Sequence, residues 1–213
     1  MSNRMADVPP NIPIPAWLAD RLWAAGGNEA PRYEASLYGP INSLLMWHFP
    51  VAQRFMIKPQ ALIRPEYINE VPLDDHDVEL VRVSLDSYSG EVISRDEKGE
   101  EQSLKRPDFI AVKATPSLHN DRILLVVEIK RRGVKLESAK EQIAEYFGSL
   151  ADKTCFGTDQ PIFDRLDGLL ILGREAMKVS LAHPGGAVEF SRPYSITSGT
   201  IHNFLRSIVI AHL

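Results

Sequence analysis

Three charged residues in the middle of the chain have the types and the spacing that a hydrolytic site needs. Asp108 opens a predicted strand over 107–114, and Glu128 and Lys130 close the next predicted strand, over 122–130. Because side chains alternate across a strand, Glu128 and Lys130 point to the same side of the sheet. If the two strands pair antiparallel, the start of the first lies beside the end of the second, so all three side chains converge at one sheet edge.

Two carboxylates and a lysine in this arrangement predict phosphodiester hydrolysis. Paired carboxylates can hold a hard divalent cation such as Mg²⁺ or Mn²⁺, which keeps several waters and takes phosphate oxygens as further ligands. The backbone carbonyl of Ile129 could supply another oxygen. Lys130 could orient or deprotonate a water and neutralise charge that develops on the phosphate. The alternative is two strand-end charges facing solvent, with Glu128 and Lys130 as a surface pair.

This pattern resembles a known signature. Pro107-Asp108 followed by Glu128-Ile129-Lys130 is similar to the motif of the PD-(D/E)xK nuclease superfamily, which has the restriction-endonuclease-like fold. The resemblance covers about residues 78–173, where the order of the predicted elements also agrees. It implies that Asp108 and Glu128 bind the metal and that Lys130 serves the attacking water. The activity it implies is metal-dependent hydrolysis of DNA or RNA.

Three residues outside the signature fit the same resemblance. Gln142 and Tyr146 lie four apart on a predicted helix, so they share a face. Such a pair is similar to the RecB-like nuclease branch, where it lines the active site; the alternative makes Tyr146 a core residue and Gln142 a boundary residue. Glu34 lies on the apolar face of an earlier predicted helix, where many nucleases of this fold carry a glutamate that assists the metal. Its alternative role is a half-exposed acid that complements the helix dipole.

Basic residues are concentrated around the motif. Such a cluster could guide a phosphate backbone towards the metal, although a charge run is otherwise a solvated edge. We expect Arg131, Arg132 and Lys135 to bind substrate. The full cluster is Lys105, Arg106, Lys130, Arg131, Arg132 and Lys135.

The elements that must position these residues suggest one α/β domain over 15–213, after a proline-rich arm over 1–14. With the resemblance, they predict a restriction-endonuclease-like three-layer fold, in which a central mixed β-sheet lies between helices. Helices are predicted from 15 to the Gly26-Gly27 pair, over 31–48 with a kink or break at Gly39-Pro40, and over 136–151 and 198–211; strands are predicted over 78–85, 91–94, 107–114, 122–130, 167–173, 178–183 and 188–190. The proline-punctuated segment 49–77 has no assignment.

Length and composition bound the function classes. The chain has 213 residues and a formal net charge of −4. Its pI of about 5.9 argues against a protein held to nucleic acid by bulk positive charge, although a local basic patch remains compatible. The single cysteine, Cys155, excludes an intrachain disulfide, a four-cysteine zinc site and an iron–sulfur cluster, and it favours a reducing compartment. Without a visible signal peptide or apolar span, we expect a soluble intracellular protein of the cytoplasm or nucleus with no membrane partner, which could form a homodimer.

Two interpretations in which the protein is not a nuclease stay open. In the first, the domain keeps the nuclease fold but binds nucleic acid or a protein partner without cutting; the acidic pI favours this, and the intact Asp, Glu and Lys set disfavours it. In the second, the motif is incidental in a structural or assembly domain, which predicts no response to metal.

Overall fold

The computed structural model describes residues 13–26, 35–60, 92–95, 101–104, 106–115, 121–151, 165–182 and 185–213. In this part of the chain, one mixed sheet has the strand order β1-β4-β5-β6-β7-β8, and β9 also pairs with β7. Its strands are β1 (Phe55–Pro59), β4 (Phe109–Lys113), β5 (Arg122–Lys130), β6 (Leu166–Leu172), β7 (Glu175–Leu181), β8 (Val188–Phe190) and β9 (Tyr194–Ser195). The β5–β6 pair is parallel, and the other pairs are antiparallel.

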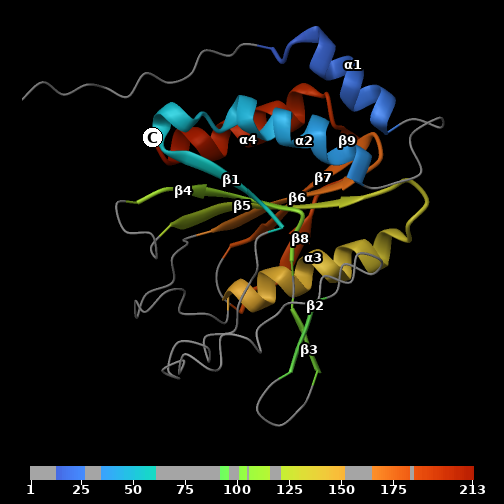
Figure 1. Cartoon of the computed structure of the whole chain (residues 1–213), viewed down its shortest axis with the longest axis vertical. Coiled ribbons are helices and arrows are strands. Elements are labelled where there is room, and N and C mark those ends of the chain that lie inside the picture. Colours follow the sequence, from blue (N-terminus) through green and yellow to red (C-terminus); the bar gives the residue numbers. More distant parts are fainter. Residues whose placement is uncertain are drawn as a thin grey trace, which may run out of the picture.

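Helices cover both faces of the sheet, as the sequence predicts. One face carries α3, and the other carries α2 and α4, with α1 next to α2 (Figure 1). The bounds are α1 (Ala16–Ala25), α2 (Ala35–His48), α3 (Leu136–Ala151) and α4 (Gly199–Ala211). The chain is therefore an α/β structure with an open mixed sheet between helices. None of the helices in the described ranges is long and apolar enough to cross a bilayer.

Strand β5 is the central element because apolar residues cover both of its faces. Val127 and Ile129 pack into the core on the α2 and α4 side, whereas Val126 packs into the core on the α3 side. A strand buried on both faces needs this nearly continuous apolar run. The crossover from β5 to β6 is α3, which packs closely on β6, since a Cβ on Gly168 would lie 2.7 Å from the Phe147 ring.

Several element predictions need correction. Strand β1 lies in the segment that had no assignment; within it only Phe55 is buried, so its alternation is weak. The helix α2 runs unbroken through Pro40, so the predicted break does not occur, because the missing N–H of a proline removes only one helical hydrogen bond. A kink at this position stays a prediction. Strand β7 begins at Glu175, directly after a two-residue turn, and ends at Leu181, so it lies earlier than the predicted 178–183.

A second, two-stranded sheet is formed by β2 (Val92–Arg95) and β3 (Glu101–Leu104), which pair antiparallel. Strand β2 overlaps the predicted strand over 91–94, whereas β3 has no predicted counterpart. The predicted strand at 78–85 and most of the N-terminal arm lie outside the described residues. Strand β9 is too short to leave a periodic signal in the sequence.

Candidate active site

The register of β4 on β5 brings Asp108 next to Glu128. Phe109 pairs with Val127 in this antiparallel ladder, so the next position along the ladder sets Asp108 opposite Glu128. The backbone N–H of Ile129 donates to Asp108 Oδ2 at 2.6 Å and holds the carboxylate against the end of β5. The predicted antiparallel pairing of the two strands is confirmed, and it places Asp108 beside the end of β5.

Glu128 and Lys130 form a buried ion pair on the α3 side of β5. Lys130 Nζ lies 2.7 Å from Glu128 Oε1, and the side chains are 18% and 2% exposed, respectively. They follow Val126, whose side chain packs in the α3-side core, at alternate positions of the strand. An exposure of 2% excludes the alternative in which Glu128 belongs to a solvent-facing surface pair.

Tyr38, on α2, reaches Asp108 from the other face of the sheet. Its hydroxyl donates to Asp108 Oδ1, and its ring meets the Phe109 ring edge-on with centroids 5.5 Å apart. Burial raises the pKa of Asp108, and the contacts with Tyr38, the Ile129 N–H and Lys130 oppose that effect without cancelling it. A carboxyl group this enclosed is typical of functional sites, although ion-pair networks also produce such shifts.

The sequence analysis missed the contact between Tyr38 and Asp108. Tyr38 keeps helical spacing with Leu37 and Ile41, so the pattern marks it as one more apolar position. The available signal is chemical, because a tyrosine hydroxyl on the buried face of a helix needs a hydrogen-bond partner. Which partner it finds depends on how α2 crosses the sheet, and local sequence does not specify this.

Gln142 and Tyr146 share a face of α3, as predicted, and the hydroxyl of Tyr146 joins them to the site. Gln142 Nε2 donates to the Tyr146 hydroxyl oxygen at 2.6 Å, and that hydroxyl donates to the Arg106 carbonyl at 3.2 Å. Burial raises the pKa of Tyr146, and the negative charge of Glu128 raises it further, so the hydroxyl stays protonated. Tyr146 packs in the α3-side core and Gln142 lies at its boundary, which agrees with the alternative interpretation of this pair. That the pair lines an active site stays a prediction.

The remaining predicted site residues lie apart from this network or cannot be located. Arg131, Arg132 and Lys135 are exposed on the segment that follows β5. Glu34 lies outside the described residues, as does Lys105.

The oxygen donors at this edge suit a hard cation that completes its shell with water and substrate. In the described residues, no group of three or more His, Cys, Asp and Glu side chains could hold a metal ion. Asp108 accepts one hydrogen bond on each oxygen, and a carboxylate offers about four lone-pair sites. Because the N–H and C=O of a strand residue face the same neighbour, the Ile129 carbonyl also faces Asp108. Asp108, Glu128 and that carbonyl fit Mg²⁺ or Mn²⁺, which needs only one or two carboxylates from the protein.

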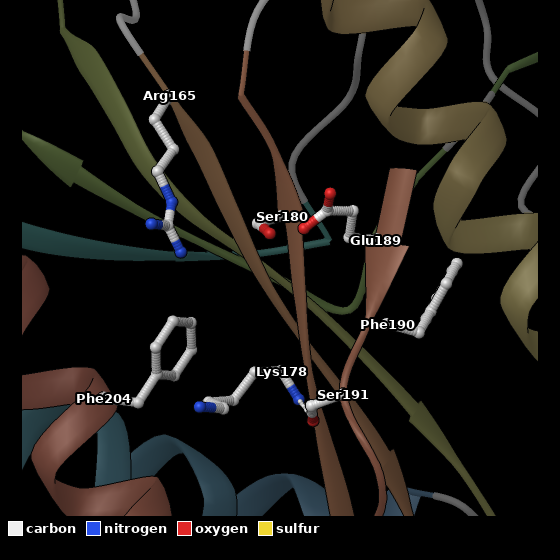
Figure 2. A pocket seen from close by; sticks show the side chains of 7 residues that line it. All are labelled: Arg165, Lys178, Ser180, Glu189, Phe190, Ser191 and Phe204. Atoms are coloured by element: carbon white, nitrogen blue, oxygen red, sulfur yellow. Dashed lines mark hydrogen bonds between the residues drawn. The ribbon is translucent and has the colours of Figure 1, made fainter. Parts of the chain in front are cut away.

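A hollow at the other end of the sheet lacks this chemistry. It has a volume of about 210 Å³, below the roughly 300 Å³ of the smaller ligand pockets, and Figure 2 shows Arg165, Lys178 and Glu189 around it with the Phe204 ring. The hollow lies away from the candidate site, because Arg165 precedes the start of β6 and Lys130 pairs with the last residue of β6, Leu172. With a single carboxylate in its lining, the hollow offers no pair of acids. Its lining residues are Arg165, Lys178, Ser180, Glu189, Phe190, Ser191 and Phe204.

Comparisons of the chain with models of known protein families, with curated proteins and with solved structures give no match.

Proposed function

We propose that this protein is a metal-dependent nuclease that hydrolyses phosphodiester bonds in DNA or RNA, with the restriction-endonuclease-like fold that its PD-(D/E)xK resemblance implies. The observation that carries the proposal is the register of β4 on β5, with Asp108 opposite Glu128 and Lys130 paired to Glu128 at 2.7 Å. Support also comes from α3, which follows β5 and brings Tyr146 to the same charged residues.

Each residue has a role in this proposal. Asp108, Glu128 and the Ile129 carbonyl would hold Mg²⁺ or Mn²⁺, which when bound supplies a Lewis acid that stabilises charge on the phosphate. The ammonium of Lys130 would orient the attacking water and neutralise developing negative charge. Tyr38 keeps the Asp108 carboxylate in one orientation.

The flanking residues would serve the substrate. Tyr146 and Gln142 would line the site and contact the substrate backbone. Arg131, Arg132 and Lys135 are exposed and would attract the phosphates. If Glu34 assists the metal, as the resemblance implies, it would do so from the segment before α2.

A second candidate function is a nuclease-like module that binds nucleic acid without cutting it. The observation that favours it is the internal pairing of the network: Asp108 accepts from Tyr38 and Ile129, and Glu128 pairs with Lys130. Polar groups paired in this way can serve a purely structural purpose. Catalysis and metal binding, measured separately, distinguish the two functions.

The test is an incubation of labelled single- and double-stranded DNA and RNA with Mg²⁺, Mn²⁺ or chelator. The informative variant is Asp108→Asn, because the new amide can still accept from the Ile129 N–H and can donate to the Tyr38 hydroxyl oxygen. The matched control is Asp121→Asn. Asp121 is also 8% exposed, but it precedes β5 at the opposite end of the strand and pairs with Lys58.

We expect cleavage of at least one substrate with Mn²⁺ or Mg²⁺ and none with chelator. Asp108→Asn should lower the rate by at least about 100-fold with an unchanged unfolding temperature, and Asp121→Asn should retain the rate. If no substrate is cut but Mn²⁺ raises the unfolding temperature of the parent and not of Asp108→Asn, the metal site stands and the nuclease is refuted in favour of the non-cutting module. Absence of both cleavage and a metal-dependent shift refutes the metal site itself.

A further inference from the structure

The end of α1 is packed against the turn that joins β6 to β7, beside the proposed site. A Cβ on Gly26 would lie 2.5 Å from the Gly173 carbonyl carbon, so no larger residue allows this approach. The N–H of Gly173 donates to the Lys130 carbonyl at 3.1 Å, and a Cβ on Gly173 would lie 3.4 Å from Arg132 Cβ. The end of α1, this turn and the end of β5 thus form one continuous surface, on the same side of the fold in Figure 1.

Trp23 projects from this surface in a fixed orientation. Its side chain is 52% exposed, whereas tryptophan is highly buried on average. The guanidinium carbon of Arg174 lies 3.9 Å from the ring centroid, and Arg174 Nε donates to the Trp23 carbonyl at 2.7 Å. Because Arg174 already orders the ring, the Trp23 side chain loses little conformational entropy when a ligand stacks on it.

The surroundings of Trp23 suit one kind of ligand. The Arg174 guanidinium lies against the ring, and the exposed Arg132 lies beside Gly173, in the turn that meets the end of α1. Cations beside an exposed aromatic ring are the features that bind single-stranded nucleic acid, because phosphates meet the cations and an unpaired base stacks on the ring. A duplex could use the cations, but its paired bases cannot stack on Trp23.

We propose that Trp23, backed by Arg174, is a stacking platform for an unpaired base of the strand that binds at Asp108, Glu128 and Lys130. The substrate therefore includes a single-stranded segment. This inference rests on the proposed nuclease function and names its substrate class.

The test measures binding by fluorescence anisotropy in chelator, where no cleavage occurs, with a labelled 15-nucleotide single-stranded DNA and the blunt duplex of the same sequence. Trp23→Ala should weaken single-strand binding about tenfold, within the range of alanine substitutions at base-stacking residues, and leave duplex binding unchanged. Trp23→Phe keeps an aromatic face and should restore most of the affinity. The control is Trp47→Ala, because Trp47 is also exposed (41%). Trp47 lies near the C-terminal end of α2, from which the chain continues to Phe55. Phe55 pairs with Lys113, at the end of β4 opposite to Asp108.

Failure of this inference differs from failure of the proposed function. If the parent binds and cuts single strands and Trp23→Ala does so equally well, the stacking platform is wrong and the nuclease stands. If Trp23→Ala weakens single-strand and duplex binding alike, Trp23 is a general contact and the substrate class is wrong. A parent protein that neither binds nor cuts any nucleic acid overturns the proposed function, and the platform with it.

Discussion

The ion pair between Glu128 and Lys130 is the contact at the site whose loss should destabilise the fold most. Replacing Lys130 by methionine keeps the length and apolar stem of the side chain but leaves the carboxylate of Glu128, which is 2% exposed, without its ammonium. Removing one partner of a buried pair costs about 3–5 kcal/mol. Because Lys130 is itself 18% exposed, we expect the lower end, about 3 kcal/mol. In a domain of this size that lowers the unfolding temperature by roughly 6–12 °C.

The assay is thermal unfolding followed by circular dichroism at pH 7.5 in chelator. A control of matched geometry is Lys58→Met, since Lys58 lies 2.7 Å from Asp121 but is 41% exposed. This more solvated pair should contribute about 1 kcal/mol. Burial, rather than distance, is then the variable that separates the two results.

A double-mutant cycle supplies the refuting measurement. Glu128→Gln combined with Lys130→Met removes both charges, so the double variant should recover about 2 kcal/mol relative to Lys130→Met alone. Simple additivity of the single-variant effects would refute the expected coupling between the charges of Glu128 and Lys130. Mn²⁺ should raise the unfolding temperature of Lys130→Met but not that of the double variant, since a bound cation replaces the lost charge beside Glu128.

Two further predictions concern contacts of α2. Tyr38→Phe keeps the ring on Phe109 but removes the hydroxyl that donates to Asp108, so it should lower the free energy of unfolding by about 2 kcal/mol. It should also raise the Asp108 pKa further, so that cleavage falls more at pH 6 than at pH 8. An unchanged pH profile of cleavage would contradict this role of Tyr38. His48 Nε2 lies 3.0 Å from His202 Nδ1, and burial, with a smaller effect of His202, lowers the pKa of His48 from 6.5 to about 4. The unfolded state then binds more protons between these values, so stability should decline as the pH falls from about 6.5 to about 4, by up to about 3 kcal/mol. Denaturant titrations at pH 7.5, 5.5 and 4.5 should show this decline in the parent and a smaller one in His48→Phe. An equal decline of the free energy of unfolding with pH in both proteins would show that other groups cause it.

The sequence predicted the central part of the fold because its signals there are local. The nearly continuous apolar run from Ile123 to Val127 identifies a strand buried on both faces, and the periodicity of 136–151 identifies an amphipathic helix. Strand β1 was not predicted, because its local sequence signal is weak. Five residues with one fully buried side chain carry too little periodicity, and the strand exists because β4 offers it a partner.

In the candidate site too, some features follow from the local sequence and others only from the tertiary structure. The spacing of Glu128 and Lys130 decided that they share one side of β5, because a strand alternates its side chains whatever surrounds it. That Asp108 lies opposite Glu128 required the register of β4 on β5, which is set by packing across the whole sheet. The Tyr38 hydroxyl on Asp108 and the Trp23 ring on Arg174 join residues 70 and 151 positions apart.

The sequence by itself thus determined which chemical groups the chain carries, and which of them share a face of one element, because those properties depend on neighbours within a few residues. Only the tertiary structure decided how deeply Glu128 is buried, which hydroxyl holds Asp108, and that α1 ends beside the turn between β6 and β7. These follow from how helices cross the sheet, and that crossing is fixed by the close packing of the two cores.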